Sequence, residues 1–140
     1  MTNHRIARFA TILLASATAC VFGPKRIQLT TAPEIPAAQS SVKVSSTDNG
    51  NTKLELVVQH LASPERVSSG ATTYVVWVLG HEPSARPQNI GALRVDPDLN
   101  GSLTAVTPLH EFELFVTAEA TQSVTTPNSK RLLYTNVSMK

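Results

Sequence analysis

The sequence predicts an all-β fold, an antiparallel β-sandwich of about seven strands with immunoglobulin-like architecture. Short segments that alternate apolar and polar residues recur between turn-forming clusters, at the spacing typical of sandwiches. Beyond the first 19 residues, no segment keeps helical periodicity over ten positions. The longest β-branched and aromatic run, TTYVVWVLG at residues 72–80, contains the only tryptophan, Trp77. We expect this run to be a central strand that is covered on both faces.

The N-terminus has the pattern of an export signal. In residues 1–19 a basic start precedes a short apolar core and small residues, which predicts a secretory signal peptide. The apolar core is too short to span a bilayer, which takes about 20 apolar residues. Thr18 and Ala19 precede Cys20, the only cysteine, and this resembles the bacterial lipobox, although Ala17 stands where lipoproteins usually have leucine. We therefore expect Cys20 to be the site of lipid attachment.

The alternative for this segment is ordinary cleavage after Ala19, which would leave a free thiol at the new terminus. An odd exposed thiol is a liability in an oxidising compartment, so lipidation is the interpretation that we prefer. Each buried methylene contributes about 0.8 kcal/mol, so two or three acyl chains anchor a protein permanently. Val21, rather than the aspartate that holds Gram-negative lipoproteins at the inner membrane, follows Cys20. The resemblance thus predicts a bacterial cell-envelope protein, lipid-anchored in the outer membrane and facing the periplasm.

Charge argues against nucleic-acid partners. The chain has 12 Lys and Arg and 10 Asp and Glu, and removal of residues 1–19 with Arg5 and Arg8 leaves the two signs equal in number. No basic excess remains to attract nucleic acid, and no run of Lys and Arg in the sequence indicates an acidic lipid surface.

Residues 20–41 are expected to be the lipidated N-terminus and a tether. Pro24, Pro33 and Pro36 lie among small and polar residues, and prolines favour extended spacers. An edge strand around residues 27–29 is the alternative. The sandwich domain is then expected at residues 42–140.

Seven strands are expected in this domain, where alternating or β-branched residues lie between turn signals. They are residues 41–46, 53–59, 72–80, 90–95, 103–106, 112–117 and 132–137. The connections are predicted as a tight turn at 48–51, a short helical turn or break at 63–68, a long polar loop at 81–89, a hairpin turn at 96–101 and a polar connector at 121–130.

The turn at residues 96–101, DPDLNG, copies the start of an EF-hand calcium loop. Such a loop needs a bidentate glutamate at its twelfth position, where this chain has Thr107. Asp, Asn and Gly also suit an ordinary hairpin turn, which is the interpretation that we prefer to weak calcium binding.

The sequence predicts no other metal or cofactor site. His60, His81 and His110 lack the close spacing of metal-ligand pairs, and a zinc site made from all three is the remaining alternative. A blue-copper site needs a cysteine thiolate, and Cys20 is already assigned to lipid attachment.

Catalytic motifs are also missing from the sequence. There is no G-x-S-x-G motif, and no glycine-rich phosphate loop leads from a strand into a helix, so nucleotide binding is not expected. Glu111 and Glu113 share a strand face and could approach each other as a glycosidase pair, but the solvated face of an amphipathic strand is the simpler interpretation. Tyr74 and Trp77 could form an aromatic ligand platform, although we expect them in the core. We expect a protein that is not an enzyme.

The order of several short motifs resembles the extracytoplasmic C-terminal domain of bacterial anti-sigma-K-factor proteins. The resemblance covers residues 53–137 and rests on KLELVVQHL, Gly70, Tyr74 with Trp77, Gly91-Ala92-Leu93, DPDLNG, Val116-Thr117-Ala118-Glu119 and Pro127. Members of that family carry a sigma-binding helical region and a transmembrane helix before this domain, whereas this chain has Cys20 and a short segment there. The resemblance therefore implies a sensor-like β-sandwich module without sigma-factor binding or catalytic residues.

These observations together predict a non-enzymatic lipoprotein that displays a β-sandwich as an interaction or sensing module, held by its N-terminal lipid and with a protein partner in the envelope. The alternative is a domain that binds a small ligand or glycan through the 81–89 loop and Trp77. A hydrolase is the third hypothesis, and it would require His81 or His110 beside a serine or carboxylate in a cleft.

Overall fold

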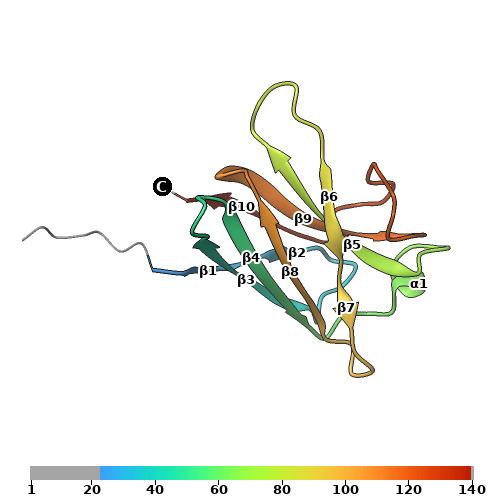
Figure 1. Ribbon diagram of the computed structural model, residues 1–140. Coiled ribbons are helices and arrows are strands. Elements are labelled where there is room, and N and C mark those ends of the chain that lie inside the picture. The colour runs from blue at the N-terminus through green and yellow to red at the C-terminus, as the bar shows by residue number, and fades with distance from the viewer. Residues whose placement is uncertain (1–22, 140) are drawn as a thin grey trace, which may run out of the picture.

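The computed structural model describes residues 23–139, which form a sandwich of two antiparallel five-stranded sheets (Figure 1). The elements are β1 (Lys25–Gln28), β2 (Thr30–Thr31), β3 (Gln39–Ser46), β4 (Thr52–Gln59), α1 (Pro64–Val67), β5 (Thr73–Gly80), β6 (Gln88–Ala92), β7 (Arg94–Val95), β8 (Gly101–Thr107), β9 (Glu111–Glu119) and β10 (Leu133–Ser138). Sheet A has the order β1-β3-β4-β8-β7, and sheet B has the order β2-β10-β9-β5-β6. The predicted fold class is confirmed.

The strand order has the immunoglobulin arrangement. Strands β3, β4, β8 and β7 follow the order A, B, E, D, and β10, β9 and β5 follow G, F, C, with β6 added beside β5. Strands β1 and β2 extend the two sheets on the same side of the sandwich, next to β3 and β10. The chain changes sheets after β1, β2, β4, β6 and β8. At each of these points, two consecutive strands belong to opposite layers of the sandwich.

Strand β5 is buried on both faces, as the sequence predicts. Tyr74, Val76 and Val78 belong to the main core between the sheets, and each is 0% exposed. Val75 and Trp77, also 0% exposed, form a second cluster with Phe115 on the outer surface of sheet B. This second cluster is covered in part by Val124 from the connector between β9 and β10. The connector therefore acts as a third layer over the centre of sheet B.

The predicted tether is wrong for residues 25–41, which belong to the sandwich. Strand β1 pairs with β3 from Lys25↔Val44 to Gln28↔Ser41, and β2 pairs with β10. Between β2 and β3 the chain turns twice and buries Ile35 and Ala38 in the core. Pro33 and Pro36 lie in these turns, where a missing amide donor costs nothing. The prolines mark turns within the domain, and the signal peptide and Cys20 lie outside the described residues.

The predicted strand at residues 90–95 is two strands in different sheets. Strand β6 pairs with β5 in sheet B, whereas β7 pairs with β8 in sheet A. The pairing of β6 shifts register between Val76 and Trp77, and Gly91 has a φ of +133°, a conformation that residues with a Cβ rarely adopt. Leu93, 6% exposed, then lies between the two strands and fills the core at the crossing.

Candidate functional site

The aromatic residues of β5 are packing residues. Trp77 stacks on Phe115 with ring centroids 6.3 Å apart, and the Arg131 guanidinium lies 4.5 Å from the centroid of the Phe115 ring. The hydroxyl of Tyr74 donates a hydrogen bond to the backbone oxygen of Ala62 at 2.6 Å. Because both aromatic side chains are fully buried, they offer no platform to a ligand. The expectation that they belong to the core is confirmed.

A buried polar chain fastens the connector to sheet B. Trp77 Nε1 donates to Thr117 Oγ1 at 2.9 Å, and Thr117 Oγ1 donates to Glu119 Oε1 at 2.7 Å. Glu119, 2% exposed, also accepts hydrogen bonds from the backbone N–H of Asn128 at 3.0 Å and from its Nδ2 at 3.3 Å. The sequence gives no sign of this role, since an acidic residue on the outer side of a strand is expected to face solvent. The buried carboxylate of Glu119 therefore links the connector to strand β9.

The loop after β5 is shorter than predicted, because β6 already begins at Gln88. Residues 81–87 project beyond the sheets at the top of Figure 1. Asn89 lies in β6, and its Nδ2 donates to the backbone oxygens of Gln122 and Val124 at 2.9 and 2.8 Å. Asn89 thus holds the connector between β9 and β10. Only residues 81–87 of the predicted ligand-binding loop extend outward.

The DPDLNG segment forms the expected hairpin turn between β7 and β8. Asp96 Oδ1 accepts the backbone N–H of Asn100 at 2.8 Å, and Asp96 Oδ2 accepts Asn100 Nδ2 at 3.3 Å. The hydrogen bond from the backbone of Asn100 is the main cause that lowers the pKa of Asp96 below its usual value. Leu99 has a φ of +61°, so a leucine occupies the left-handed position of the turn. The carboxylate of Asp96 thus closes the turn.

Three of the remaining candidates, His110, Glu113 and Glu111, have local partners. His110 Nδ1 lies 3.4 Å from Thr52 Oγ1, which itself donates to the backbone oxygen of Leu109 at 2.7 Å. Glu113 forms an ion pair with Arg131 at 3.1 Å. Glu111 accepts a hydrogen bond from Ser138 at 3.4 Å. Within residues 23–139, no group of three or more His, Cys, Asp and Glu side chains could hold a metal ion. In the same range, no helix has the length and apolar character needed to cross a membrane.

A group of cations lies on the outer surface of sheet A, which we call the basic face. Its charged residues are Arg26 on β1, Lys43 on β3, Lys53 and Glu55 on β4, and Arg94 on β7. The registers Arg26↔Lys43 and Lys43↔Glu55 place three of them in one row across neighbouring strands. The buried residues that alternate with them, such as Val42, Leu54 and Leu56, belong to the core. Alternation therefore turns all these charged side chains to the same outer surface.

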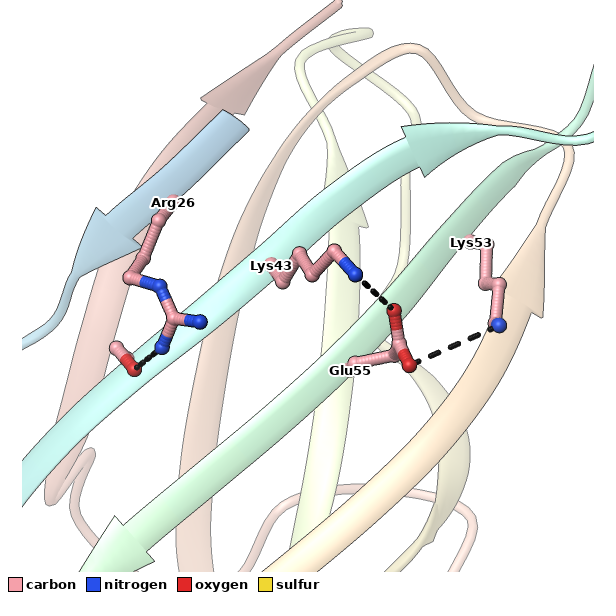
Figure 2. A network of polar contacts seen from close by, with 5 residues as sticks. Arg26, Lys43, Lys53 and Glu55 are labelled. Atoms are coloured by element: carbon pink, nitrogen blue, oxygen red, sulfur yellow. Dashed lines mark hydrogen bonds and ion pairs between the residues drawn. The ribbon is translucent and has the colours of Figure 1, made fainter. Parts of the chain in front are cut away.

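Glu55 is the centre of this arrangement, as Figure 2 shows. Its two oxygens lie 3.6 Å from Lys43 Nζ and 3.7 Å from Lys53 Nζ, and the three side chains are 36 to 43% exposed. Arg26 donates a hydrogen bond to Ser41 Oγ at 3.3 Å. Ion pairs this long and exposed contribute little to stability, because solvent screens them. The cations thus remain available to an additional anion.

Two shallow hollows lie along a row of residues that crosses the basic face from one edge of sheet A to the other. The registers Gln28↔Ser41, Ser41↔Val57, Val57↔Ser102 and Arg94↔Ser102 form a continuous row over five strands. Two hollows of about 240 and 490 Å³ meet at Val57, one toward Arg26 and the other toward Arg94. The row spans about 19 Å at the usual separation of neighbouring strands. Gln28, Ser41 and Ser102 in this row place amide and hydroxyl groups between the cations.

Sequence reasoning missed the basic face, because its cations are far apart along the chain. The four cations come from four strands, and the sequence predicts that residues 25–28 belong to the tether. The available signal was that Lys43 and Lys53 alternate with buried positions in predicted strands. Placing them side by side requires the register between the strands, which a single sequence does not supply.

Another hollow, of about 450 Å³, lies between α1 and the end of the connector. It is lined by Glu34, Val67, Ser68, Asn128, Ser129, Lys130 and Leu132. The Nζ of Lys130 lies 3.5 Å from Glu34 Oε1, so the two charged groups in its lining pair with each other. This hollow therefore presents less uncompensated charge than the basic face.

Comparisons with models of known protein families, with curated proteins and with solved structures give no match for this chain. The resemblance to anti-sigma-K-factor domains thus rests on its short motifs and stays a prediction.

Proposed function

We propose that the protein is a lipoprotein of the bacterial cell envelope that is acylated at Cys20 and displays the β-sandwich outside the cytoplasm as a non-enzymatic interaction module. The observation that carries this proposal is the basic face, an open surface on the sheet whose first strand starts at Lys25, five residues after Cys20. An exposed and flat surface of this kind suits the binding of another surface.

The burial of Trp77 also supports the choice of an interaction module over glycan binding. Stacking on an exposed aromatic ring is a common way to hold a sugar, and Trp77 is 0% exposed. Residues 81–87, which follow the C-terminal end of β5 and project beyond the sheets (Figure 1), offer a second surface to a protein partner in the envelope. Crosslinking of the anchored protein in intact cells, followed by affinity purification, identifies this partner.

Acylation is tested by mass spectrometry of the protein from cells that express the full chain. We expect the mature N-terminus to be an acylated Cys20 and the protein to sediment with outer membranes. Cys20→Ala should abolish both the acyl mass and the membrane association. Ala17→Leu, which brings the segment closer to the usual lipobox, serves as the control and should remain acylated.

The sorting residue gives a second test. Val21→Asp should move the acylated protein to the inner membrane, because aspartate after the cysteine commonly retains Gram-negative lipoproteins there. A soluble mature protein that begins at Cys20 with a free thiol would contradict the anchor and support simple secretion instead.

A further inference from the structure

We propose that the basic face docks on the anionic headgroups of the bilayer, so that the sandwich lies with sheet A against the membrane that holds its lipid. This inference rests on the proposed acylation of Cys20 for its biological setting. The affinity of the face for anionic lipid is a separate property that can be measured without the anchor.

The first argument is the distribution of charge. The basic face carries Arg26, Lys43, Lys53 and Arg94 against Glu55 and against Asp96, which lines the hollow beside Arg94, so four cations face two carboxylates. The outer surface of sheet B instead carries Glu111 and Glu113, with Arg131 paired to Glu113. On sheet A, Asp48 in the turn between β3 and β4 offsets part of the positive charge near the anchored end. The outer surface of sheet A thus carries the larger share of the cations, which turns it toward an anionic surface.

The second argument is the reach of the chain. Five residue steps separate Cys20 from Lys25, and a fully extended chain covers at most about 18 Å over that distance. The width of sheet A is about 19 Å, so the edge strand β1 stays within one sheet width of the headgroups. Lys25 pairs with Val44, at the end of β3 that leads to the β3–β4 turn. The short connection thus places Arg26, Lys43 and Lys53 close to the bilayer.

The third argument is the chemistry of the face between its charges. Val57 and Val106 are 46% and 52% exposed, and both lie on the outer surface of sheet A. Ser41 and Ser102 flank Val57 in the adjacent strands and present hydroxyl groups. Cations, hydroxyl donors and a few apolar side chains match the phosphates, glycerol oxygens and upper acyl carbons of a bilayer surface.

The anchor also favours lipid over an acidic protein or glycan. Attachment at Cys20 keeps the face at a high effective concentration of headgroups, so a weak intrinsic affinity suffices to hold it there. A soluble acidic partner would have to compete with this local excess.

The test uses residues 21–140, without the anchor cysteine. Both core clusters lie within residues 27–139, so this chain keeps the whole core. Sedimentation with phosphatidylcholine vesicles, with and without phosphatidylglycerol, measures the partition coefficient. We expect binding only to the anionic vesicles. Arg26→Gln/Lys43→Gln/Lys53→Gln should weaken it on the order of a hundredfold, since each cation near such a surface contributes about fivefold.

The matched control removes the same number of charges elsewhere. Arg66→Gln/Arg86→Gln/Lys130→Gln has the same net charge as the triple variant of the face and should retain most of the affinity. Glu55→Gln should strengthen binding, because it removes the carboxylate that lies between Lys43 and Lys53. Thermal melting checks that all variants are folded. Raising the salt to about 1 M shortens the Debye length to about 3 Å and should release the protein.

Equal losses in the two triple variants would overturn the proposal, because binding would then follow net charge and not the basic face. The absence of binding to anionic vesicles would also overturn it, whether or not Cys20 is acylated in cells. Retention on immobilised polyglutamate without affinity for anionic vesicles would assign the face to an acidic protein. Loss of acylation alone would contradict the anchor and leave the affinity of the face intact.

Discussion

Replacing Glu119 by alanine tests whether the buried carboxylate holds the connector over sheet B. The substitution removes the acceptor of hydrogen bonds from Thr117 Oγ1, the backbone N–H of Asn128 and Asn128 Nδ2. A hydrogen bond to a charged group contributes about 1.5–3 kcal/mol, and relief from burying the charge offsets part of this loss. We expect the free energy of unfolding to fall by about 3 kcal/mol, a large fraction of the roughly 5–15 kcal/mol that is typical of a domain.

Trp77 supplies the assay, because it is the only tryptophan and lies beneath the connector. Urea unfolding followed by its fluorescence gives the stability, and acrylamide quenching in the native state reports whether the cover has opened. Glu119→Ala should increase quenching as well as lower stability. Glu113→Ala, on the same strand but 23% exposed and paired with Arg131, should cost less than about 1 kcal/mol. A loss below about 0.5 kcal/mol in Glu119→Ala, with unchanged quenching, would refute the structural role.

Two other predictions concern single side chains. Burial, and to a smaller extent the charge of Glu65, raises the pKa of Tyr74 from 10.0 to about 12. The unfolded chain therefore loses the phenolic proton first, so stability should be complete below pH 10 and fall as the pH rises toward 12. Tyr74→Phe should remove this alkaline step in a pH series of urea titrations; an unchanged step would contradict the assignment. At neutral pH the same variant should lose about 1 kcal/mol, for the hydrogen bond to Ala62. Leu99→Asn should stabilise the protein by roughly 0.5–1 kcal/mol, because asparagine tolerates the positive φ of this position. Leu99→Ala, which keeps the backbone penalty, is the control and should give no gain in thermal melting.

The sequence was sufficient to predict the sandwich, because alternation and turn chemistry are local signals. The apolar residues at 72–80 predicted a strand that is covered on both faces. The turn-forming residues Asp96, Asn100 and Gly101 predicted the β7–β8 hairpin. The N-terminal segment was misread, since proline is as common in turns within a domain as in spacers. Ile35 and Ala38 gave too short an apolar pattern to reveal burial.

The basic face could not be predicted in the same way, because it depends on the register between strands. Lys43 and Lys53 each look like an ordinary solvent-facing residue of a strand. Only the register between β3 and β4 shows that both lie beside Glu55. The division of residues 88–95 into β6 and β7 was not predicted either. The chain changes sheets at Leu93, where the sequence has neither a proline nor a loop to signal the change. Glu119 was missed because its cover comes from the connector, which has no regular pattern.

The pairing of β2 with β10 has a consequence for the order in which the molecule folds. Glu34 and Lys130, next to these strands, are 96 residues apart along the chain, yet they form an ion pair. The backbone N–H of Ala32 also donates to the oxygen of Leu132 at 2.8 Å. Closing so long a loop is slow, and folding in milliseconds to seconds is typical of sandwiches with such non-local contacts. The N-terminal strands are synthesised first, but the edge of sheet B can close only after the last strand, β10, has been made.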